Sequence, residues 1–188
     1  MITDELSKIM GAAPTRADSH TVLKAHWLDT LLGPMLAIAD EHALLLLAFV
    51  ERRGLEREIE RLRQKTKSAI VPGKAEPIQS IEKEISAYFS GELVNFKTPI
   101  KMLGSDFQKK VWHELINIPA GETRSYADIA NAIGQPTACR AVANANGANQ
   151  LAIIIPCHRV INSDGKLGGY GGGVSRKEWL LGHEKEQL

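Results

Sequence analysis

The stretch SYADIANAIGQPTACRAVANANG, residues 125–147, contains the signals of two short consecutive helices. Ser125 and Asp128 have the spacing of a capping box, in which two side chains satisfy free backbone groups at the start of a helix. Gly134 is typical of a helix end, and Pro136 suits the first turn of a second helix, which would end at the last glycine of the stretch. Two short helices across a turn of three to four residues with a glycine indicate a helix-turn-helix.

The second of these helices carries several alanines, Ala141 and Ala145 among them, and Arg140 projects from it. A helix that reads the major groove usually presents several long polar side chains. Small residues with one long inserted side chain suit close approach to the minor groove instead. A tightly packed pair of core helices would also explain the alanines, and this segment alone favours that simpler interpretation.

The residues before this stretch predict a mixed first half. Residues 31–50 read as two β-strands joined by a turn near Asp40, and residues 71–77 read as a loop. Helices are predicted over residues 54–67, with Leu55, Ile59 and Leu62 on one face, over residues 77–91, and over residues 105–118 with a capping box at Ser105 and Gln108.

The predicted fold is an α/β N-terminal domain, a small sheet plus helices, over residues 1–98. A mainly α C-terminal domain with the helix-turn-helix, winged-helix-like, follows over residues 99–188. Basic residues mildly outnumber acidic ones between residues 99 and 177, while the whole chain has a net charge of +1. This charge permits nucleic-acid binding without requiring it.

A reactive pair follows the helix-turn-helix in IIIPCHRVI, residues 153–161. LAIII, residues 151–155, is a candidate apolar strand that Pro156 would end, leaving Cys157 in a turn beside His158. A thiol reacts as the thiolate, and an imidazole can accept its proton. The simpler alternatives are a cysteine that fills apolar space and a histidine satisfied in the core.

The last predicted helix, SRKEWLLGHEKE, supplies a carboxylate that could orient the imidazole. It has a capping-box pattern at Ser175, and Lys177 and Glu184 lie seven residues apart, on one face. Before it come a hairpin turn at Asp164 and a glycine-rich loop around Tyr170, where the backbone could closely approach a flat ligand.

The composition is ordinary for a globular protein, with 44% hydrophobic and 24% charged residues among 188. The longest apolar run, residues 43–50, is too short to span a bilayer. The N-terminus lacks a signal-peptide pattern, so a cytoplasmic location is expected. Two cysteines, Cys139 and Cys157, are expected to be free thiols, and they lack the spacing of a metal site.

IPCHRVI resembles the active-site motif of the O6-alkylguanine-DNA alkyltransferases, a family of DNA repair proteins. IPAGETRSYADIA, RAVANANGAN and GGYGGGVSRKEWLLGHE resemble further segments of that family, in the same order and at similar spacing. Together they cover most of residues 99–186, whereas the first half is only loosely similar to the variable N-terminal domain of the family. The zinc ligands of some relatives have no counterpart here.

The resemblance implies a stand-alone repair protein, a methylated-DNA–protein-cysteine methyltransferase. It would flip the damaged nucleotide, transfer the alkyl group from O6-alkylguanine to its own cysteine, and act once per molecule. It implies a monomer that binds double-stranded DNA through the minor groove, with no cofactor, no metal and no membrane. Competing interpretations are a cysteine hydrolase, a lesion-binding protein without transfer activity, which the presence of Cys157 disfavours, and a transcriptional DNA-binding module.

The resemblance also implies roles for individual residues. Cys157 accepts the alkyl group, His158 takes its proton through a bound water, and Glu184 polarises His158. Asn149 would brace the helix-turn-helix against the active-site loop, Tyr126 would donate a hydrogen bond to guanine, and Arg140 would fill the vacated stack. Tyr170, Gly168 and Gly171 would line the guanine pocket, which Lys177 would support. Ala141 and Ala145 would lie close to the DNA.

Overall fold

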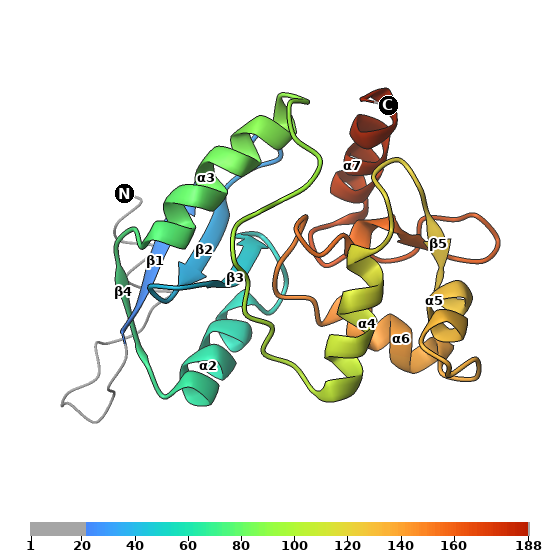
Figure 1. Ribbon diagram of the computed structural model, residues 1–188, viewed down its shortest axis with the longest axis horizontal. Helices are drawn as coiled ribbons and strands as arrows, with labels where there is room; N and C mark the ends of the chain where they lie inside the picture. The colour runs from blue at the N-terminus through green and yellow to red at the C-terminus, as the bar shows by residue number, and fades with distance from the viewer. Residues whose placement is uncertain (1–21, 188) are drawn as a thin grey trace. The chain divides into compact units, whose positions relative to one another are not determined.

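The computed structural model describes residues 22–187, so the expectation that the N-terminus is not a signal peptide falls on residues outside the described range. The chain forms two compact units (Figure 1). The described residues divide into unit 1, up to Ser86 with Lys97–Leu103, and unit 2, Ala87–Phe96 with the residues from Gly104 onwards. Residues 87–103 therefore contribute to both units, and the boundary predicted after residue 98 falls among them.

The described residues of unit 1 form a four-stranded sheet with two helices. Its strand order is β3-β2-β1-β4, with β1 antiparallel to β2, β2 antiparallel to β3, and β1 parallel to β4. The elements are β1 (Val22–Leu28), β2 (Met35–Ala39), β3 (Leu44–Phe49), α2 (Leu55–Thr66), β4 (Ala69–Pro72) and α3 (Glu76–Phe89), whose last turn belongs to unit 2. The small sheet with helices agrees with the predicted fold of the first half.

The sheet of unit 1 is buried on both faces, because every residue of β2 and β3 is buried, and α2 and α3 lie on either side of it (Figure 1). Helix α2 contributes Leu55, Ile59 and Leu62 to the core, which confirms the predicted face. The predicted hairpin is confirmed, and its turn is held by the Asp40 carboxylate, which accepts the backbone N–H groups of His42 and Ala43 at 2.8 Å.

The loop predicted over residues 71–77 is wrong at its start, where Val71 and Pro72 end strand β4. The parallel partner of β4 is β1, a strand that was not predicted from the sequence. Pro72 lacks a backbone donor and stands at the last position of an edge strand, where such a residue is tolerated.

Unit 2 is mainly helical. Its elements are the last turn of α3, α4 (Asp106–Ile116), β5 (Arg124–Ser125), α5 (Tyr126–Ala132), α6 (Cys139–Gly147), a 3₁₀ helix η1 (Cys157–Arg159), β6 (Val160–Ile161) and α7 (Val174–Glu186). Strands β5 and β6 form a short parallel pair. Both capping boxes predicted for α4 and α5 are present, and the helix-turn-helix with a small sheet agrees with the predicted fold.

The connection inside the helix-turn-helix is longer than predicted. Helix α6 begins at Cys139, not at Pro136, because residues 135–138 form a separate turn closed by the bond from Ala138 N–H to the Gln135 carbonyl at 2.9 Å. Gly134 has φ of 72°, the left-handed conformation expected after a helix end.

Two further predictions in unit 2 are wrong. Residues 151–155 form a buried turn, not a strand, since Ile153 has φ of 71° and only isolated bridges occur at Ala152 and Ile155. A short apolar run does not distinguish a strand from a buried turn. Helix α7 begins after Gly173, which has φ of 97°, and no side chain caps it, so Ser175 lies inside the helix.

Within residues 22–187, no helix combines the length and the apolar character needed to cross a membrane.

Candidate functional site

Cys157 opens the 3₁₀ helix η1 and is 7% exposed. Its Sγ accepts a hydrogen bond from Asn149 Nδ2 at 3.1 Å. The same Nδ2 donates to the carbonyl of Ile155 at 2.8 Å, and Asn149 Oδ1 accepts the N–H of Leu151 at 2.9 Å. The Asn149 side chain therefore joins the segment after α6, the buried turn and the thiol in one rigid arrangement.

His158 and Glu184 form a fully buried pair, with His158 Nε2 at 2.7 Å from Glu184 Oε1. Burial opposes ionisation of Glu184, yet hydrogen bonds from His158 and Arg159, together with the positive charge of Arg159, hold its pKa well below the ordinary range. Burial lowers the pKa of His158, against the hydrogen bond and charge of Glu184. At neutral pH we therefore assign a carboxylate beside a neutral imidazole whose Nε2–H is the donor.

This tautomer leaves His158 Nδ1 with a lone pair. Among the described residues, Nδ1 is buried and has no hydrogen-bond partner. A buried acceptor without a protein partner is costly unless water or a ligand satisfies it. The imidazole beside Cys157 is thus prepared to accept a proton at Nδ1.

Two residues that hold Glu184 were not predicted from the sequence. Arg159 Nε donates to Glu184 Oε2 at 2.8 Å and Arg159 Nη2 to Oε1 at 2.9 Å, while its Nη1 donates to the Ile118 carbonyl. The Tyr88 hydroxyl donates to Glu184 Oε1 at 2.8 Å. A charged residue within the buried IPCHRVI segment could have revealed Arg159, since buried charges need partners. No sequence signal indicated Tyr88.

Lys177 lies buried in α7 and holds the loop that follows η1. Its Nζ donates to the carbonyls of Val160 at 2.6 Å, of Leu167, and of Gly169 at 3.4 Å. Burial lowers the pKa of Lys177 to about 8, while the charge of Cys157 acts in the opposite direction. Lys177 and Glu184 are both buried, on the same face of α7, as their spacing of seven residues predicts.

The glycine-rich loop contains the other residues expected at a guanine pocket. Gly168 has φ of 69°, and a Cβ there would lie 3.1 Å from Asn162 Oδ1, so this position requires glycine. Gly171 is exposed. The ring of Tyr170 stands edge-on to His158, with 6.5 Å between ring centroids.

Tyr126 is half-buried at the start of α5. Its pKa is raised by burial and, to a smaller extent, by the charge of Cys157. The charge of Cys157 thus acts on Tyr126, while Tyr170 lies beside His158, the chain neighbour of Cys157.

Helix α6 presents Arg140 and Ala141 to solvent. Ala145, by contrast, is 2% exposed, and its carbonyl accepts the indole N–H of Trp112 at 2.8 Å. The expectation that Ala145 contacts DNA is therefore wrong, because it faces the core of unit 2. Cys139 is half-buried on the same helix, and both cysteines are free thiols, as expected.

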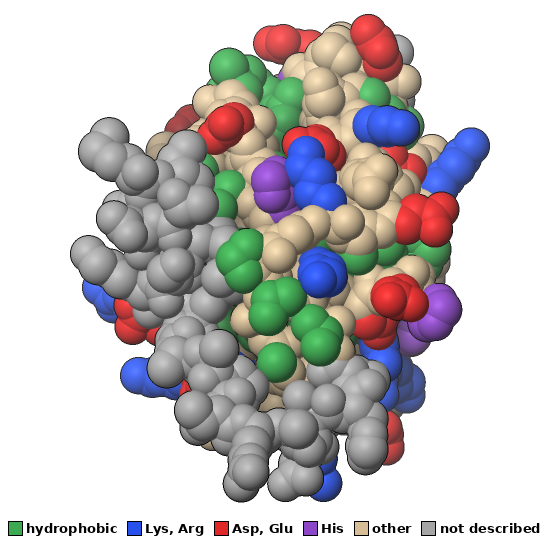
Figure 2. All heavy atoms as spheres, turned by 90° about the vertical axis from the view of Figure 1, so that its left-hand side faces the viewer, with side chains coloured by type: hydrophobic (Ala, Val, Ile, Leu, Met, Phe, Trp, Pro, Cys, Tyr) green, Lys and Arg blue, Asp and Glu red, His purple; other side chains and the backbone are tan. Residues whose placement is uncertain are grey.

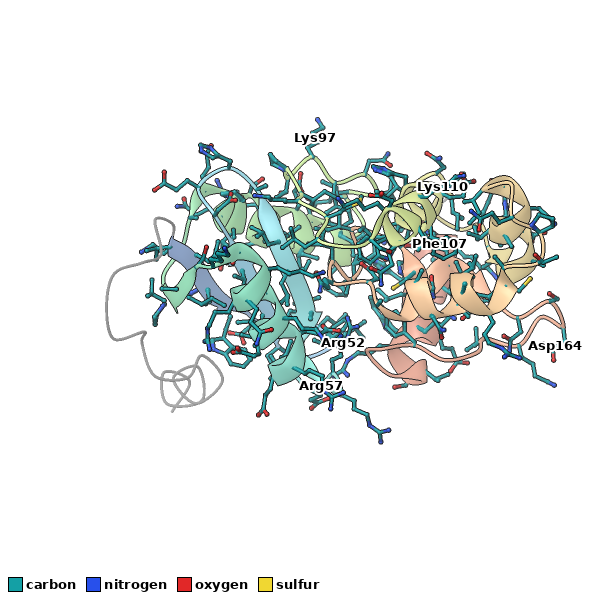
Figure 3. The ribbon with its side chains drawn as sticks, turned by 90° about the horizontal axis from the view of Figure 1, so that it is seen from below. Arg52, Arg57, Lys97, Phe107, Lys110 and Asp164 are labelled. Atoms are coloured by element: carbon teal, nitrogen blue, oxygen red, sulfur yellow. The ribbon has the colours of Figure 1, made fainter. Side chains whose placement is uncertain are left out.

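Polar side chains line a groove beside β5 and β6. Arg124, Ser125 and Asp128 form one side, and Asn162 and Ser163 contribute the other. In Figure 3 the adjoining turn, marked by Asp164, projects from unit 2 into solvent.

On the face that Figure 2 shows, which is the left-hand side of Figure 1, acidic and basic side chains are interspersed. Within the described residues, no cluster of three or more His, Cys, Asp or Glu could hold a metal ion.

Comparison with known proteins identifies related chains. Residues 106–186 match the family model for the DNA binding domain of 6-O-methylguanine DNA methyltransferase, and residues 23–102 match the model for its ribonuclease-like domain. The crystal structure of Mycobacterium tuberculosis OGT in complex with DNA has a TM-score of 0.74 and 41% sequence identity, covering 89% of this chain and 94% of that chain.

Two relatives named methylated-DNA–protein-cysteine methyltransferase show the extent of the similarity. The protein of Methanosarcina barkeri is 41% identical over 162 residues, 86% of this chain and 96% of that relative. The protein of Mycobacterium bovis is 56% identical over 104 residues, which span 55% of this chain and 63% of that relative. The similarity to the mycobacterial protein is thus higher but confined to a shorter segment.

Proposed function

Because the chain belongs to the 6-O-methylguanine DNA methyltransferase family, we propose that it repairs DNA by transferring an alkyl group from O6-alkylguanine to Cys157. The observation that carries this proposal is the buried arrangement of a thiol and a neutral imidazole with an unpartnered Nδ1 and a fixed carboxylate. Such an arrangement suits removal of one proton from a thiol.

The proposed reaction begins when the proton of Cys157 passes through a bound water to His158 Nδ1. The resulting imidazolium is stabilised by the Glu184 carboxylate at 2.7 Å from Nε2. Asn149 Nδ2 donates to Sγ at 3.1 Å and supports the thiolate as charge develops there. Lys177 contributes positive charge to the same centre.

The thiolate then attacks the alkyl carbon. A carbon–sulfur bond forms while the bond from that carbon to O6 of guanine breaks, and the electron pair leaves with guanine. Tyr126, on which the charge of Cys157 acts, would donate a hydrogen bond to guanine and improve it as a leaving group. The thioether formed on Cys157 has no route back to a thiol in this site, so each molecule reacts once.

We further propose that the damaged nucleotide leaves the duplex before transfer. A base flipped into a pocket costs a few kcal/mol, least for a poorly paired base. Arg140 and Ala141, exposed on α6, would face the minor groove, with Arg140 in the vacated stack. The related mycobacterial protein forms a complex with DNA, which supports this partner. Tyr170, Gly168 and Gly171 would line the pocket.

The remaining features of the proposal follow from this chemistry. No cofactor enters the reaction, because the cysteine itself receives the alkyl group. We place the protein in the cytoplasm, where a reducing environment keeps thiols free, and expect it to act as a monomer. DNA binding and alkyl acceptance are assigned to the C-terminal domain, residues 99–188.

The test is incubation with excess duplex that contains O6-methylguanine, followed by mass analysis of peptides. We expect one methyl group on the peptide with Cys157, none on that with Cys139, and no repair after one equivalent. Cys157→Ser should abolish transfer and still bind DNA, because a hydroxyl ionises far less readily than a thiol. Several repaired lesions per protein molecule would exclude the proposed reaction.

A further inference from the structure

The geometry points to Tyr88 as a positioning residue of this centre, whose hydroxyl fixes Glu184 Oε1 and thereby sets how strongly His158 holds a proton. This inference rests on the proposed function of Cys157 and His158. Tyr88 lies at the end of α3 and is fully buried.

The two oxygens of Glu184 have unequal surroundings. Oε1 accepts from the Tyr88 hydroxyl at 2.8 Å, from His158 Nε2 at 2.7 Å and from Arg159 Nη2 at 2.9 Å. Oε2 accepts from Arg159 Nε at 2.8 Å. The oxygen that holds the imidazole is therefore the one that Tyr88 also holds.

This sharing has a chemical consequence. Each donor draws negative charge from Oε1 and weakens its attraction for the proton on His158 Nε2. A less strongly polarised imidazole is a weaker base at Nδ1, where the thiol proton is to arrive. Tyr88 itself stays protonated, because burial and then the charge of Glu184 raise its pKa far above the ordinary range. It acts as a permanent neutral donor.

Other groups also face this pair. Among the described residues, the titratable or charged groups that interact with His158, Glu184 and Tyr88 are Arg159, Tyr170, Lys177 and His183. Cys157 is the chain neighbour of His158. Removing Arg159 or Lys177 would change the charge of the site. Replacing Tyr88 by Phe changes no charge at neutral pH, so it isolates the effect of one hydrogen bond.

The ring of Tyr88 is held without its hydroxyl. It packs edge-on against Phe89 at 5.5 Å and His183 at 5.3 Å, and tilted against Phe96 at 5.6 Å, measured between centroids. All these residues belong to unit 2. Tyr88→Phe should therefore keep the ring in place while Arg159 keeps the carboxylate in place.

The first experiment compares wild type and Tyr88→Phe by the pH dependence of methyl transfer from duplex DNA, in a Cys139→Ser background. We expect the acid limb of the rate profile to move to higher pH by about half a unit to one unit, because His158 becomes a stronger base. The control variant is Phe96→Leu, which disturbs the contact with the Tyr88 ring but keeps its hydroxyl. It should lower stability and leave the limb unmoved.

The second experiment needs no activity. In protein with ¹⁵N-labelled histidine, the titration of His158 should move upward by the same amount in Tyr88→Phe. Replacing Tyr88 alone by fluorotyrosine, whose hydroxyl is a stronger donor, should move the titration of His158 to lower pH. If wild type transfers methyl groups but neither the limb nor the titration moves, Tyr88 has no such role. If wild type transfers none, the proposed function fails, and the titration alone decides the link from Tyr88 to His158.

Discussion

Unit 1 and unit 2 bury different kinds of side chain. In the described part of unit 1 the core is apolar, and the buried polar residues are Ser68 and Thr98, neither of them charged. Unit 2 buries four ionisable side chains near the thiol, together with two asparagines: His158, Arg159, Lys177 and Glu184, with Asn146 and Asn149. Among the described residues, unit 1 has the Arg52–Glu58 ion pair near its surface, with side chains 9% and 14% exposed, whereas unit 2 buries its charged groups completely or almost completely beside the thiol.

The cost of burying charge explains where the chemistry lies. A buried charge is expensive unless hydrogen bonds and opposite charge compensate it. In unit 2 hydrogen bonds compensate each buried charge, because Arg159 donates to both oxygens of Glu184 and Lys177 donates to backbone carbonyls. Apolar residues would stabilise a fold at lower cost, so the buried charges indicate a site prepared for reaction.

The largest measurable effect short of losing Cys157 is expected at Arg140, on the surface of unit 2. Arg140→Ala should slow repair of duplex DNA roughly ten- to a thousandfold, since support for the extruded base is lost. A free base such as O6-benzylguanine needs no flipping, so the variant should react with it at nearly the wild-type rate. Transfer rates on both substrates measure the difference.

Arg140→Lys distinguishes stacking from simple charge. An ammonium group lacks the planar face of guanidinium, so this variant should stay partly impaired on duplex DNA. A phosphate contact would behave otherwise, with Lys substituting well and a defect that fades as salt is lowered. Equal slowing on duplex and free base would mean that Arg140 supports the fold of unit 2.

A smaller effect is expected inside the buried cluster. Glu184→Gln should slow transfer at neutral pH by about ten- to a hundredfold, because an amide polarises His158 less than a carboxylate. DNA affinity should change little. Raising the pH should recover part of the rate, since the thiol then ionises without help. A wild-type rate at neutral pH would contradict the proposed role of Glu184.

The same variant should change the pH dependence of stability. The pKa of Glu184 is lowered in the folded protein, so its contribution is present above the ordinary value of 4.5 and is lost as the pH falls below it. Glu184→Gln should therefore be less stable than wild type at neutral pH, also because Arg159 loses its partner. The difference in the free energy of unfolding should shrink in acid, as denaturant titrations at several pH values would show.

Within unit 2, the elements differ in how far the sequence predicts them. Capping boxes at Ser105 and Ser125 fix helix starts by local hydrogen bonds, and these predictions are confirmed. The start of α7 and the turn at Ile153 depend on left-handed backbone and on tertiary hydrogen bonds from Asn149, which leave no local pattern. Tyr88 reaches Glu184 from a distant part of the chain, and spacing carries no information about such a contact.

The smallest effect on transfer is expected from the core of unit 1. Leu46 is fully buried in β3, within the cluster that includes Ile38 and Ile59. Leu46→Ala should lower the free energy of unfolding by about 2–5 kcal/mol, since it removes buried apolar surface and leaves a cavity. Leu31, 70% exposed, provides the matched control, and Leu31→Ala should change stability little. The transfer rate should be measured at a temperature where Leu46→Ala is still folded. The rate per active molecule and the acid limb of the pH–rate profile should then equal those of wild type, because the apolar core of unit 1 contributes no charge to the thiol. A shifted acid limb in Leu46→Ala would show that the two units do not divide stability and chemistry between them as their buried residues indicate.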